Sequence, residues 1–254
     1  MGTIVSIEVV HPHADAAIES AFAWFREIEA RCTRFNQSSE LMQLVAQPGV
    51  PIPASRILFE AVRFSLIVAE ATEGAFDPTT AGHFKDLVLD PEQNTITLNR
   101  QITLDLGAVA KGLAVDAAAR ELEPFEHFAI DAGGDLYLGG LNPNAEPWTV
   151  GIRHPRRDRE VVHTLRVSNQ AVCTSGDYER GHHIQDPRTG KPAHSVASAT
   201  VIAPSAMLAD ALATAAFVLG PDEGILLLHR MGVEGLIFTP DLHLSETRGL
   251  PRVA

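Results

Sequence analysis

Apolar and polar positions follow two periods along the chain, and these predict separate helices and strands. Apolar residues that recur every three to four positions predict helices at 15–35, 55–74, 108–122, 204–220 and 222–232. Alternation and short apolar runs between turn residues predict strands within 4–10, 127–140, 147–155, 161–169, 171–177, 197–204, 235–240 and 242–247. Residues 95–106 (TITLNRQITLDL) predict a hairpin, and residues 74–82 (GAFDPTTAG) predict a loop.

The helix ends carry their own signals. Ser55 is expected to cap the start of helix 55–74, with Gly74 at its C′ position. Pro204 is expected to begin helix 204–220, with Gly220 at C′. Helices and strands do not alternate regularly, and consecutive strands outnumber strand–helix–strand units. This order predicts an α+β fold with mixed, largely antiparallel sheets and packed helices. No linker-like stretch interrupts the chain, so residues 1–254 are expected to form a single domain.

Composition narrows the classes of function. Apolar residues make up 45% of the 254 positions, and the formal net charge is −12. A chain this acidic lacks the basic face that nucleic-acid or anionic-membrane binding requires, so neither partner is expected. A phosphate-rich ligand would need local lysine, arginine or a divalent cation.

Cysteine content and apolar runs bear on the compartment. Cys32 and Cys173 lie far apart and outside any CxxC pair, which predicts two buried free thiols. No apolar run reaches the roughly 18–20 residues of a membrane span. The first residues, MGTIVSIEVV, show neither a signal peptide nor a lipobox cysteine. As written, the chain is expected to be cytoplasmic; a chain trimmed of a leader would be periplasmic or lipid-anchored.

The common catalytic motifs are absent: the sequence contains no GxGxxG, GxxxxGK[ST], GxSxG or HExxH. The segment LDLGAVAKGLAVD (104–116) runs from a strand ending at Asp105 through Gly107 into a helix that carries Lys111 and Gly112. Such a helix start can hold a phosphate, with the lysine as a point charge. Taken by themselves, the residues favour an ordinary strand-to-helix turn over a phosphate site.

Asp210 and Thr214 lie four residues apart on an otherwise apolar predicted helix, and therefore on one face. A carboxylate and a hydroxyl offer the oxygen ligands that Mg²⁺ prefers. The alternative is a buried, hydrogen-bonded aspartate with a threonine bonded back to its own helix. The pattern alone does not decide between them.

The segment SGDYERGHHIQDPRTG (175–190) contains two adjacent histidines before a turn that begins Asp-Pro. His183 could act as a general base near neutral pH, or it could be a surface residue. Adjacent side chains of a strand point to opposite faces, which argues against joint metal ligation by His182 and His183. The four-arginine run RHPRRDRE (153–160) is interpreted as a solvated hairpin tip.

Taken together, several strings resemble the FAD:protein FMN transferase family, also called ApbE. They occur in the family's order and span nearly the whole chain: MGT, TRFNQSSELMQL, GAFDPTTAG, LDLGAVAKGLAVD, DAGGDL, TSGDYERGHHIQDPRTG and ADALAT. The resemblance implies an ApbE, T-fold-like arrangement. It also implies Mg²⁺-dependent transfer of FMN from FAD to a threonine hydroxyl of an acceptor flavoprotein, with release of AMP. The acceptor would carry a D/S-G-x-T-S/T motif.

The resemblance also implies roles for individual residues. The Mg²⁺ ligands would be Asp210, Thr214 and the backbone carbonyl of Ala108. His183 would be the base for the acceptor hydroxyl. The FAD contacts would be Met1, Ala75, Phe76, Asp77, Asp105, Lys111 and Ile184.

The chain departs from the family pattern at three places. Val45 stands where many members have asparagine, DPTTAGH replaces DPTVGPL, and only about twenty residues separate this loop from Asp105. Three other functions remain as alternatives. The first is a pyrophosphatase that converts FAD to FMN and AMP, the second a non-catalytic flavin-binding protein, and the third a purely structural α+β protein.

Overall fold

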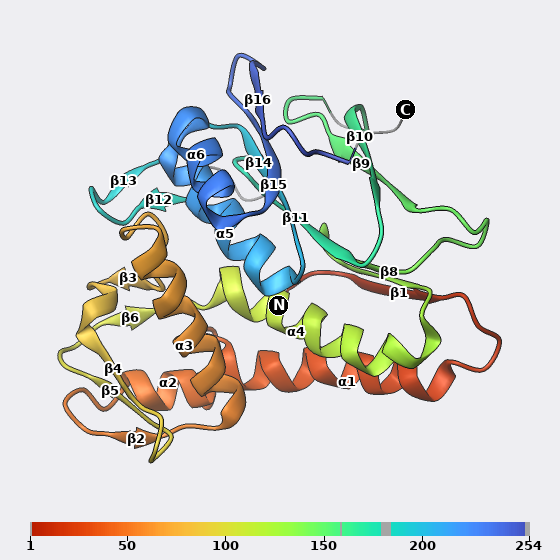
Figure 1. Ribbon diagram of the computed structural model, residues 1–254. Coiled ribbons are helices and arrows are strands. Elements are labelled where there is room, and N and C mark those ends of the chain that lie inside the picture. Colours follow the sequence, from red (N-terminus) through yellow and green to blue (C-terminus); the bar gives the residue numbers. More distant parts are fainter. Residues whose placement is uncertain (1, 158, 179–183, 252–254) are drawn as a thin grey trace.

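The computed structural model describes residues 2–157, 159–178 and 184–251 (Figure 1). Over these ranges helices combine with sheets in which every strand pair is antiparallel, which confirms the α+β class. The main sheet of this described part has seven strands in the order β1-β7-β8-β11-β14-β15-β16. They are β1 (Val5–Val9), β7 (Phe128–Ala132), β8 (Asp135–Gly139), β11 (Gln170–Gly176), β14 (Ser198–Ala203), β15 (Glu234–Phe238) and β16 (Leu244–Glu246). The predicted strands in these regions are confirmed.

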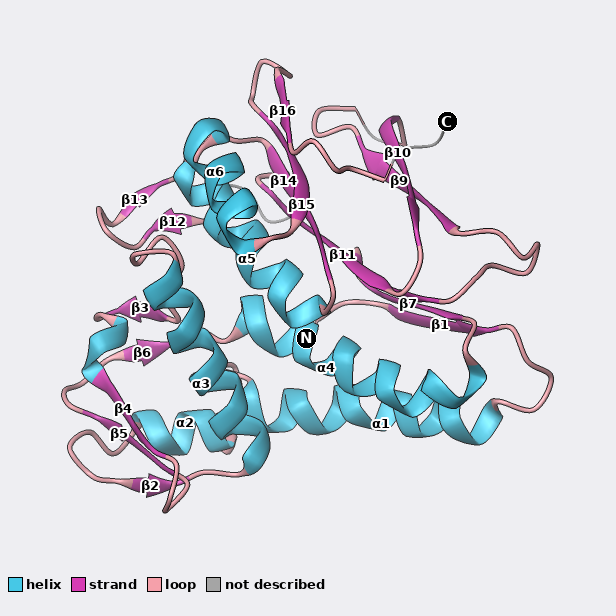
Figure 2. Ribbon diagram, in the orientation of Figure 1, coloured by secondary structure: helices cyan, strands magenta, loops and turns pink. Residues whose placement is uncertain are grey.

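Helices cover one face of the main sheet and a strand pair covers the other (Figure 2). On the helical face, α4 (Gly107–Leu122), α5 (Ala206–Leu219) and α6 (Pro221–Met231) pack on the sheet, and α1 (Asp15–Cys32) packs against α4. The other face is covered by β9 (Trp148–Arg153) and β10 (Val161–Val167). Alternation along β11 serves both cores: Ala171 and Cys173 face the helices, and Val172 faces the β9–β10 pair.

Smaller elements extend from the helical layer. They are α2 (Glu40–Val45), α3 (Arg56–Ala71), β2 (Ile52–Pro53), β3 (Thr79–Ala81), β4 (Leu87–Asp90), β5 (Thr95–Leu98), β6 (Thr103–Leu104), the 3-10 turns η1 (Phe84–Asp86) and η2 (Glu123–Phe125), and the hairpin of β12 (Gln185–Asp186) and β13 (Lys191–Pro192). In Figure 1 this hairpin lies above β3 and the upper end of α3. None of the helices within the described ranges combines the length and hydropathy of a membrane span. Cys32 and Cys173 are buried free thiols, as predicted.

The prediction of a hairpin at 95–106 is wrong. β5 pairs with β4 and β2, whereas β6 pairs with β3, so the two strands belong to different sheets. The partner β3 lies inside the segment 74–82 that was predicted as a loop, and that prediction is therefore partly wrong as well. Alternation of apolar residues identifies a strand, but it does not identify the strand with which it pairs.

The predicted ends of helices 55–74 and 204–220 are correct to within a residue or two, whereas helix 15–35 ends at Cys32. Ser55 caps α3, accepting a hydrogen bond from the backbone N–H of Leu58 at 3.2 Å. The helix ends earlier than predicted, so Glu73 and not Gly74 occupies C′, with φ of 53°. Gly74 follows at C″ and donates to the carbonyl of Ala69 at 2.9 Å, which completes a Schellman motif. In α5 the N-cap is Ser205, one residue after the predicted Pro204, and Gly220 is the C-cap rather than C′.

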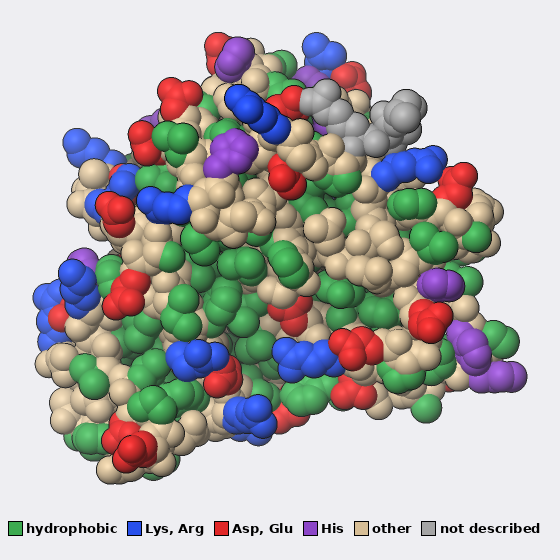
Figure 3. All heavy atoms as spheres, in the orientation of Figure 1, with side chains coloured by type: hydrophobic (Ala, Val, Ile, Leu, Met, Phe, Trp, Pro, Cys, Tyr) green, Lys and Arg blue, Asp and Glu red, His purple; other side chains and the backbone are tan. Residues whose placement is uncertain are grey.

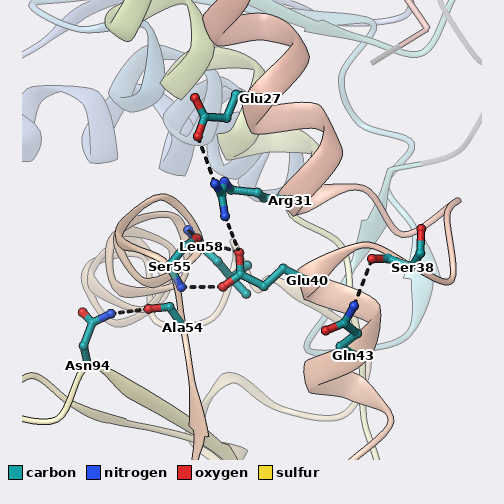
Figure 4. Close-up of polar contacts among 9 residues, drawn as sticks. All are labelled: Glu27, Arg31, Ser38, Glu40, Gln43, Ala54, Ser55, Leu58 and Asn94. Carbon is teal, nitrogen blue, oxygen red and sulfur yellow. Dashed lines mark hydrogen bonds and ion pairs between the residues drawn. The ribbon is translucent and has the colours of Figure 1, made fainter.

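The carboxylate of Glu40 joins three helices (Figure 4). One oxygen accepts from the backbone N–H of Ser55, and the other accepts from the Ser55 hydroxyl at 2.6 Å. Arg31 of α1 lies 3.3 Å from the same carboxylate and also pairs with Glu27. Glu40 of α2 therefore fixes the start of α3 against the end of α1.

Replacing Glu40 with alanine is expected to lower the free energy of unfolding by about 1–3 kcal/mol, because a part-buried N–H and a hydroxyl lose their acceptor. The matched control on the same helix is Gln43→Ala, which removes only an exposed bond to the Ser38 carbonyl. The control is expected to stay within about 0.5 kcal/mol of the wild type. Urea unfolding of the three chains measures the difference, and equal losses for both variants would contradict the role of Glu40.

Helices α4 and α5 cross at very close range. A Cβ atom added at Gly112 of α4 would lie 2.5 Å from the Met207 Cα and 2.6 Å from the Ala206 carbonyl carbon. No side chain fits there without separating the helices, so glycine is required for the close approach. One turn further along α4, the buried Asp116 accepts from the backbone N–H of Ala206 at 2.6 Å and of Met207 at 3.0 Å.

Asp116 and Ser205 together satisfy the first donors of α5. The Ser205 hydroxyl accepts from Leu208 at 3.3 Å, next in the chain to the two N–H groups held by Asp116. A carboxylate at a helix N-terminus is also favoured by the helix dipole. Burial nevertheless raises the pKa of Asp116 to about 6, against the lowering effect of its two hydrogen bonds.

This raised pKa predicts a pH dependence of stability. Between pH about 4 and about 6 the folded chain keeps a proton that the unfolded chain releases, so this contribution to stability is present below pH 4 and is lost as the pH rises through 6. The side-chain amide of an Asp116→Asn variant does not titrate. The stability advantage of the wild type over this variant is therefore expected to shrink by about 1–3 kcal/mol between pH 4 and pH 7 in urea unfolding. An advantage that grows with pH would mean that the two N–H groups outweigh burial.

Candidate functional site

The crossing of α4 and α5 places Lys111 beside Asp210. The Lys111 Nζ lies 3.5 Å from the Asp210 Oδ2 and also contacts the Oδ2 of Asp135, the first residue of β8. The side chains of Asp135 and Asp210 are only 2% and 8% exposed, whereas that of Lys111 is 21% exposed. Ala108 lies one turn before Lys111 on the same face of α4. The structure thus brings together Lys111 and Asp210, both predicted from sequence, and adds Asp135.

Thr214 shares the face of α5 that carries Asp210. Its hydroxyl donates to the Asp210 carbonyl at 3.2 Å and lies 3.2 Å from the hydroxyl of Ser175 on β11. The back-bonded threonine that the sequence left open is therefore present. It does not remove Thr214 as a cation ligand, because a hydroxyl oxygen has two lone pairs.

The charges at this crossing leave a net negative centre. Two carboxylates, from Asp135 and Asp210, face one ammonium, from Lys111, so the sum is −1. Directly behind them, burial and then the charge of Asp210 raise the pKa of the Cys173 thiol well above its ordinary value. The thiol is therefore neutral and adds no charge. In the described ranges 2–157, 159–178 and 184–251, no three His, Cys, Asp or Glu side chains gather as a metal cluster. A cation here would need backbone or hydroxyl oxygens as well as carboxylates.

Asp105 organises the start of α4. Its Oδ1 accepts from the backbone N–H of Gly107 at 2.8 Å, and its Oδ2 lies 3.1 Å from the Nε of Arg34. The backbone N–H of Asp105 donates to the Pro78 carbonyl at 2.8 Å, which ties the end of β6 to the 74–82 segment. Arg34 in turn stacks over the ring of Phe35, which is 83% exposed.

The predicted FAD contacts of the 74–82 segment differ in accessibility. The side chains of Ala75 and Phe76 are 0% and 4% exposed and face the core. Both residues are therefore buried in this structure, backbone included. Asp77 holds the segment in shape by accepting from Thr79 at 2.8 Å and from Phe84 at 3.0 Å.

The QDPRTG turn lies against this segment. The Thr189 N–H donates to the Asp186 carbonyl at 3.2 Å, with Pro187 second in the turn as predicted. Arg188 forms two bonds of 2.9 Å to the Asp186 carboxylate and lowers the pKa of that carboxyl. The Arg188 stem also lies 3.8 Å from a Cβ built on Gly74.

Three predicted site residues remain: Ile184, Met1 and His183. Ile184 is half-buried and packs on the main core. Met1 and His183 lie outside the described residues, as does His182.

The surface over these helices is largely apolar. Figure 3 shows mainly hydrophobic side chains over α3, α4 and α5 in the middle of the face seen in Figure 1, with charged side chains gathered around them.

Sequence reasoning missed three contributors. Asp135 and Asp116 each stood within a string quoted above, and an acidic residue inside an apolar strand or helix was the available signal. Arg156 forms an ion pair that was not predicted, although the arginine run does lie at the exposed tip of the β9–β10 hairpin, as interpreted. Its guanidinium binds both oxygens of Asp177, at 2.6 and 2.8 Å, just beyond the end of β11. No sequence signal linked these two residues.

Comparisons with known proteins find relatives over most of the chain. The ApbE family model matches residues 1–86 and 80–237. A relative from Treponema pallidum, named FAD:protein FMN transferase, is 30% identical, with 98% of this chain and 85% of the relative covered. A relative of the same name from Salmonella typhimurium is 34% identical over 92% of this chain and 80% of its own length.

Solved structures give the same result for the fold. The ApbE protein from Thermotoga maritima superposes with a TM-score of 0.89 at 27% identity, over 97% of this chain and 94% of its own. The flavin transferase ApbE from Vibrio cholerae superposes with a TM-score of 0.88 at 25% identity, over 99% and 94%. With the family match extending over most of its length, the chain belongs to the ApbE family.

Proposed function

We propose that this chain transfers FMN from FAD to a threonine hydroxyl of an acceptor flavoprotein and releases AMP, with Mg²⁺ bound at Asp210, Thr214 and the Ala108 carbonyl. Membership in a family whose relatives are flavin transferases makes the chain an enzyme. The observation that carries the finer proposal is the buried carboxylate of Asp210, held beside Lys111 where α4 and α5 cross.

The residues present fit a hard divalent cation. The donors offered by Asp210, Thr214 and the Ala108 backbone are all oxygens, which suits Mg²⁺ better than zinc. The crossing already binds one cationic group, the Lys111 ammonium, and still carries a net charge of −1. A buried carboxylate is costly without such compensation, so an added cation is electrostatically favoured.

The reaction requires positioning and charge neutralisation more than covalent chemistry. The threonine oxygen attacks the phosphorus of the FMN half, the bond to the AMP oxygen breaks, and the hydroxyl proton leaves. When bound, Mg²⁺ neutralises charge on the pyrophosphate. In this proposal His183 takes the hydroxyl proton.

The chain's other residues hold FAD for this reaction. Ala75, Phe76 and Asp77 would form one side of the site, in a segment whose shape is held by the Asp77 carboxylate. Asp105 and Lys111 act at the start of α4, near the pyrophosphate. Met1 and Ile184 would contact the flavin end. Because the chain carries a formal net charge of −12, the binding of an anionic pyrophosphate depends on the divalent cation.

Incubation with FAD, MgCl₂ and an acceptor bearing a D/S-G-x-T-S/T motif is expected to give a covalently fluorescent acceptor band on a denaturing gel. The control acceptor has its motif threonine replaced by alanine and stays dark. An unlabelled acceptor, under conditions where the Vibrio cholerae flavin transferase labels it, would refute the transferase. Release of FMN and AMP without labelling would instead identify a pyrophosphatase.

Two variants separate cation binding from proton transfer. Asp210→Ala is expected to reduce Mg²⁺-dependent labelling by about 10²–10³-fold, because the carboxylate that holds the cation is lost. His183→Ala is expected to slow labelling by about 10²-fold while FAD affinity changes little. Labelling rates and fluorescence titration with FAD measure both effects. A normal rate for His183→Ala would show that this histidine is not the base.

A further inference from the structure

Lys111 lies between two buried carboxylates and approaches one of them more closely than the other. Its ammonium contacts Asp135 directly, whereas the distance to Asp210 is 3.5 Å. Asp135 is the more deeply buried of the two, with a side chain 2% exposed against 8% for Asp210. The lysine is therefore drawn toward Asp135 and away from the proposed cation ligand.

The β7–β8 hairpin fixes Asp135 in this position. Asp135 pairs with Ala132 across a two-glycine turn in which Gly133 and Gly134 have φ of 67° and 95°. The turn is braced by Asp131, whose Oδ1 accepts from the Gly134 N–H at 2.8 Å. The Asp135 side chain thus comes from a rigid element of the sheet and meets Lys111 on the helix that packs on it.

We propose that Asp135 is a positioning residue that anchors the Lys111 ammonium and thereby leaves the Asp210 carboxylate able to bind a divalent cation. The inference rests on the proposed cation site and adds a residue that sets its affinity. An ammonium and a divalent cation repel each other and compete for the same carboxylate. Asp135 supplies a second carboxylate, so that the ammonium and the divalent cation can both be held in one buried site.

Loss of the Asp135 charge is expected to change which carboxylate Lys111 binds. In an Asp135→Asn variant, Lys111 would keep a single buried carboxylate partner, that of Asp210. A buried ammonium is costly unless it is paired, so Lys111 would move fully onto Asp210. The divalent cation would then have to displace a salt bridge before it could bind.

The test is a titration with Mn²⁺, a probe for the Mg²⁺ site, followed by the electron paramagnetic resonance signal of the free ion. Asp135→Asn is expected to weaken Mn²⁺ binding by about tenfold or more, the size typical of lost supporting contacts around metal ligands. The matched control is Asp131→Asn in the same hairpin, which keeps an oxygen for the Gly134 N–H and should bind within about twofold of the wild type.

The decisive comparison removes the lysine. In a Lys111→Met background, Asp135→Asn is expected to weaken Mn²⁺ binding by less than about threefold, because no ammonium is left to occupy Asp210. A loss of the same size in both backgrounds would mean that Asp135 acts through its own charge or as a ligand, and would overturn the proposal. Unchanged binding by the Asp135→Asn single variant would overturn it too.

Two further outcomes are also decisive. If Asp135→Asn does not fold, the comparison of Lys111→Met with the double variant still applies, since that pair of variants removes the lysine first. A loss above about threefold there refutes the anchoring role, and a smaller loss supports it. Absence of Mn²⁺ binding by the wild-type chain would refute the cation site itself, and with it this inference. If the wild type binds Mn²⁺, the cation site stands, and the variants then test only the anchoring role of Asp135.

Discussion

The close crossing of α4 and α5 is the contact on which the rest of the site depends. Gly112 removes the side chain that would keep the helices apart, and Asp116 binds the first two N–H groups of α5. One contact is steric and the other electrostatic, and both act on the same turn of α5. Because helix packing is rigid, fixing that turn also fixes Asp210 one turn further on. Lys111, adjacent to Gly112 in sequence, is then brought to Asp210 without any contribution from a flexible loop.

The charges around this crossing follow from its burial. Asp116, Asp135 and Asp210 are all less than 9% exposed, and each has a specific partner for its charge. Two backbone N–H groups compensate the Asp116 charge in part, whereas Asp135 and Asp210 share one lysine. The first arrangement is a helix cap; the second holds two negative charges against one positive charge. This difference distinguishes a structural contact from a place where a cation is favoured.

The surrounding loops are ordered by the same kind of short polar contact. Asp77, Asp105 and Asp186 each accept backbone N–H bonds within a few residues of their own position. Such local bonds shape a turn without needing a core. They hold the 74–82 segment, the start of α4 and the QDPRTG turn in shape. The family resemblance assigned FAD contacts to the first two of these segments and to Ile184, just before the third.

Most of the secondary structure followed from the periodicity of the sequence. The long amphipathic helices and the strands of the main sheet were predicted in the right places, with ends that differ by up to about three residues. Burial of one face imposes a period that the local sequence must carry. The prediction failed at residues 95–106, where β5 and β6 join different sheets. Strands of two to four residues bury too little for their partners to be specified by alternation. The ion pair of Arg156 was missed for a related reason, since its partner, Asp177, lies 21 residues away.

By itself, then, the sequence determined the α+β class, the positions of the main elements, and the strings that resemble one family. It also selected Asp210, Thr214 and Lys111, because polar residues on apolar helices are conspicuous in one dimension. Only the tertiary structure decided that Lys111 is shared between Asp135 and Asp210, and that Asp116 caps a helix 90 residues later. Electrostatic partnership depends on distances of a few ångströms, and those distances are set by how the helices pack on the sheet rather than by spacing along the chain.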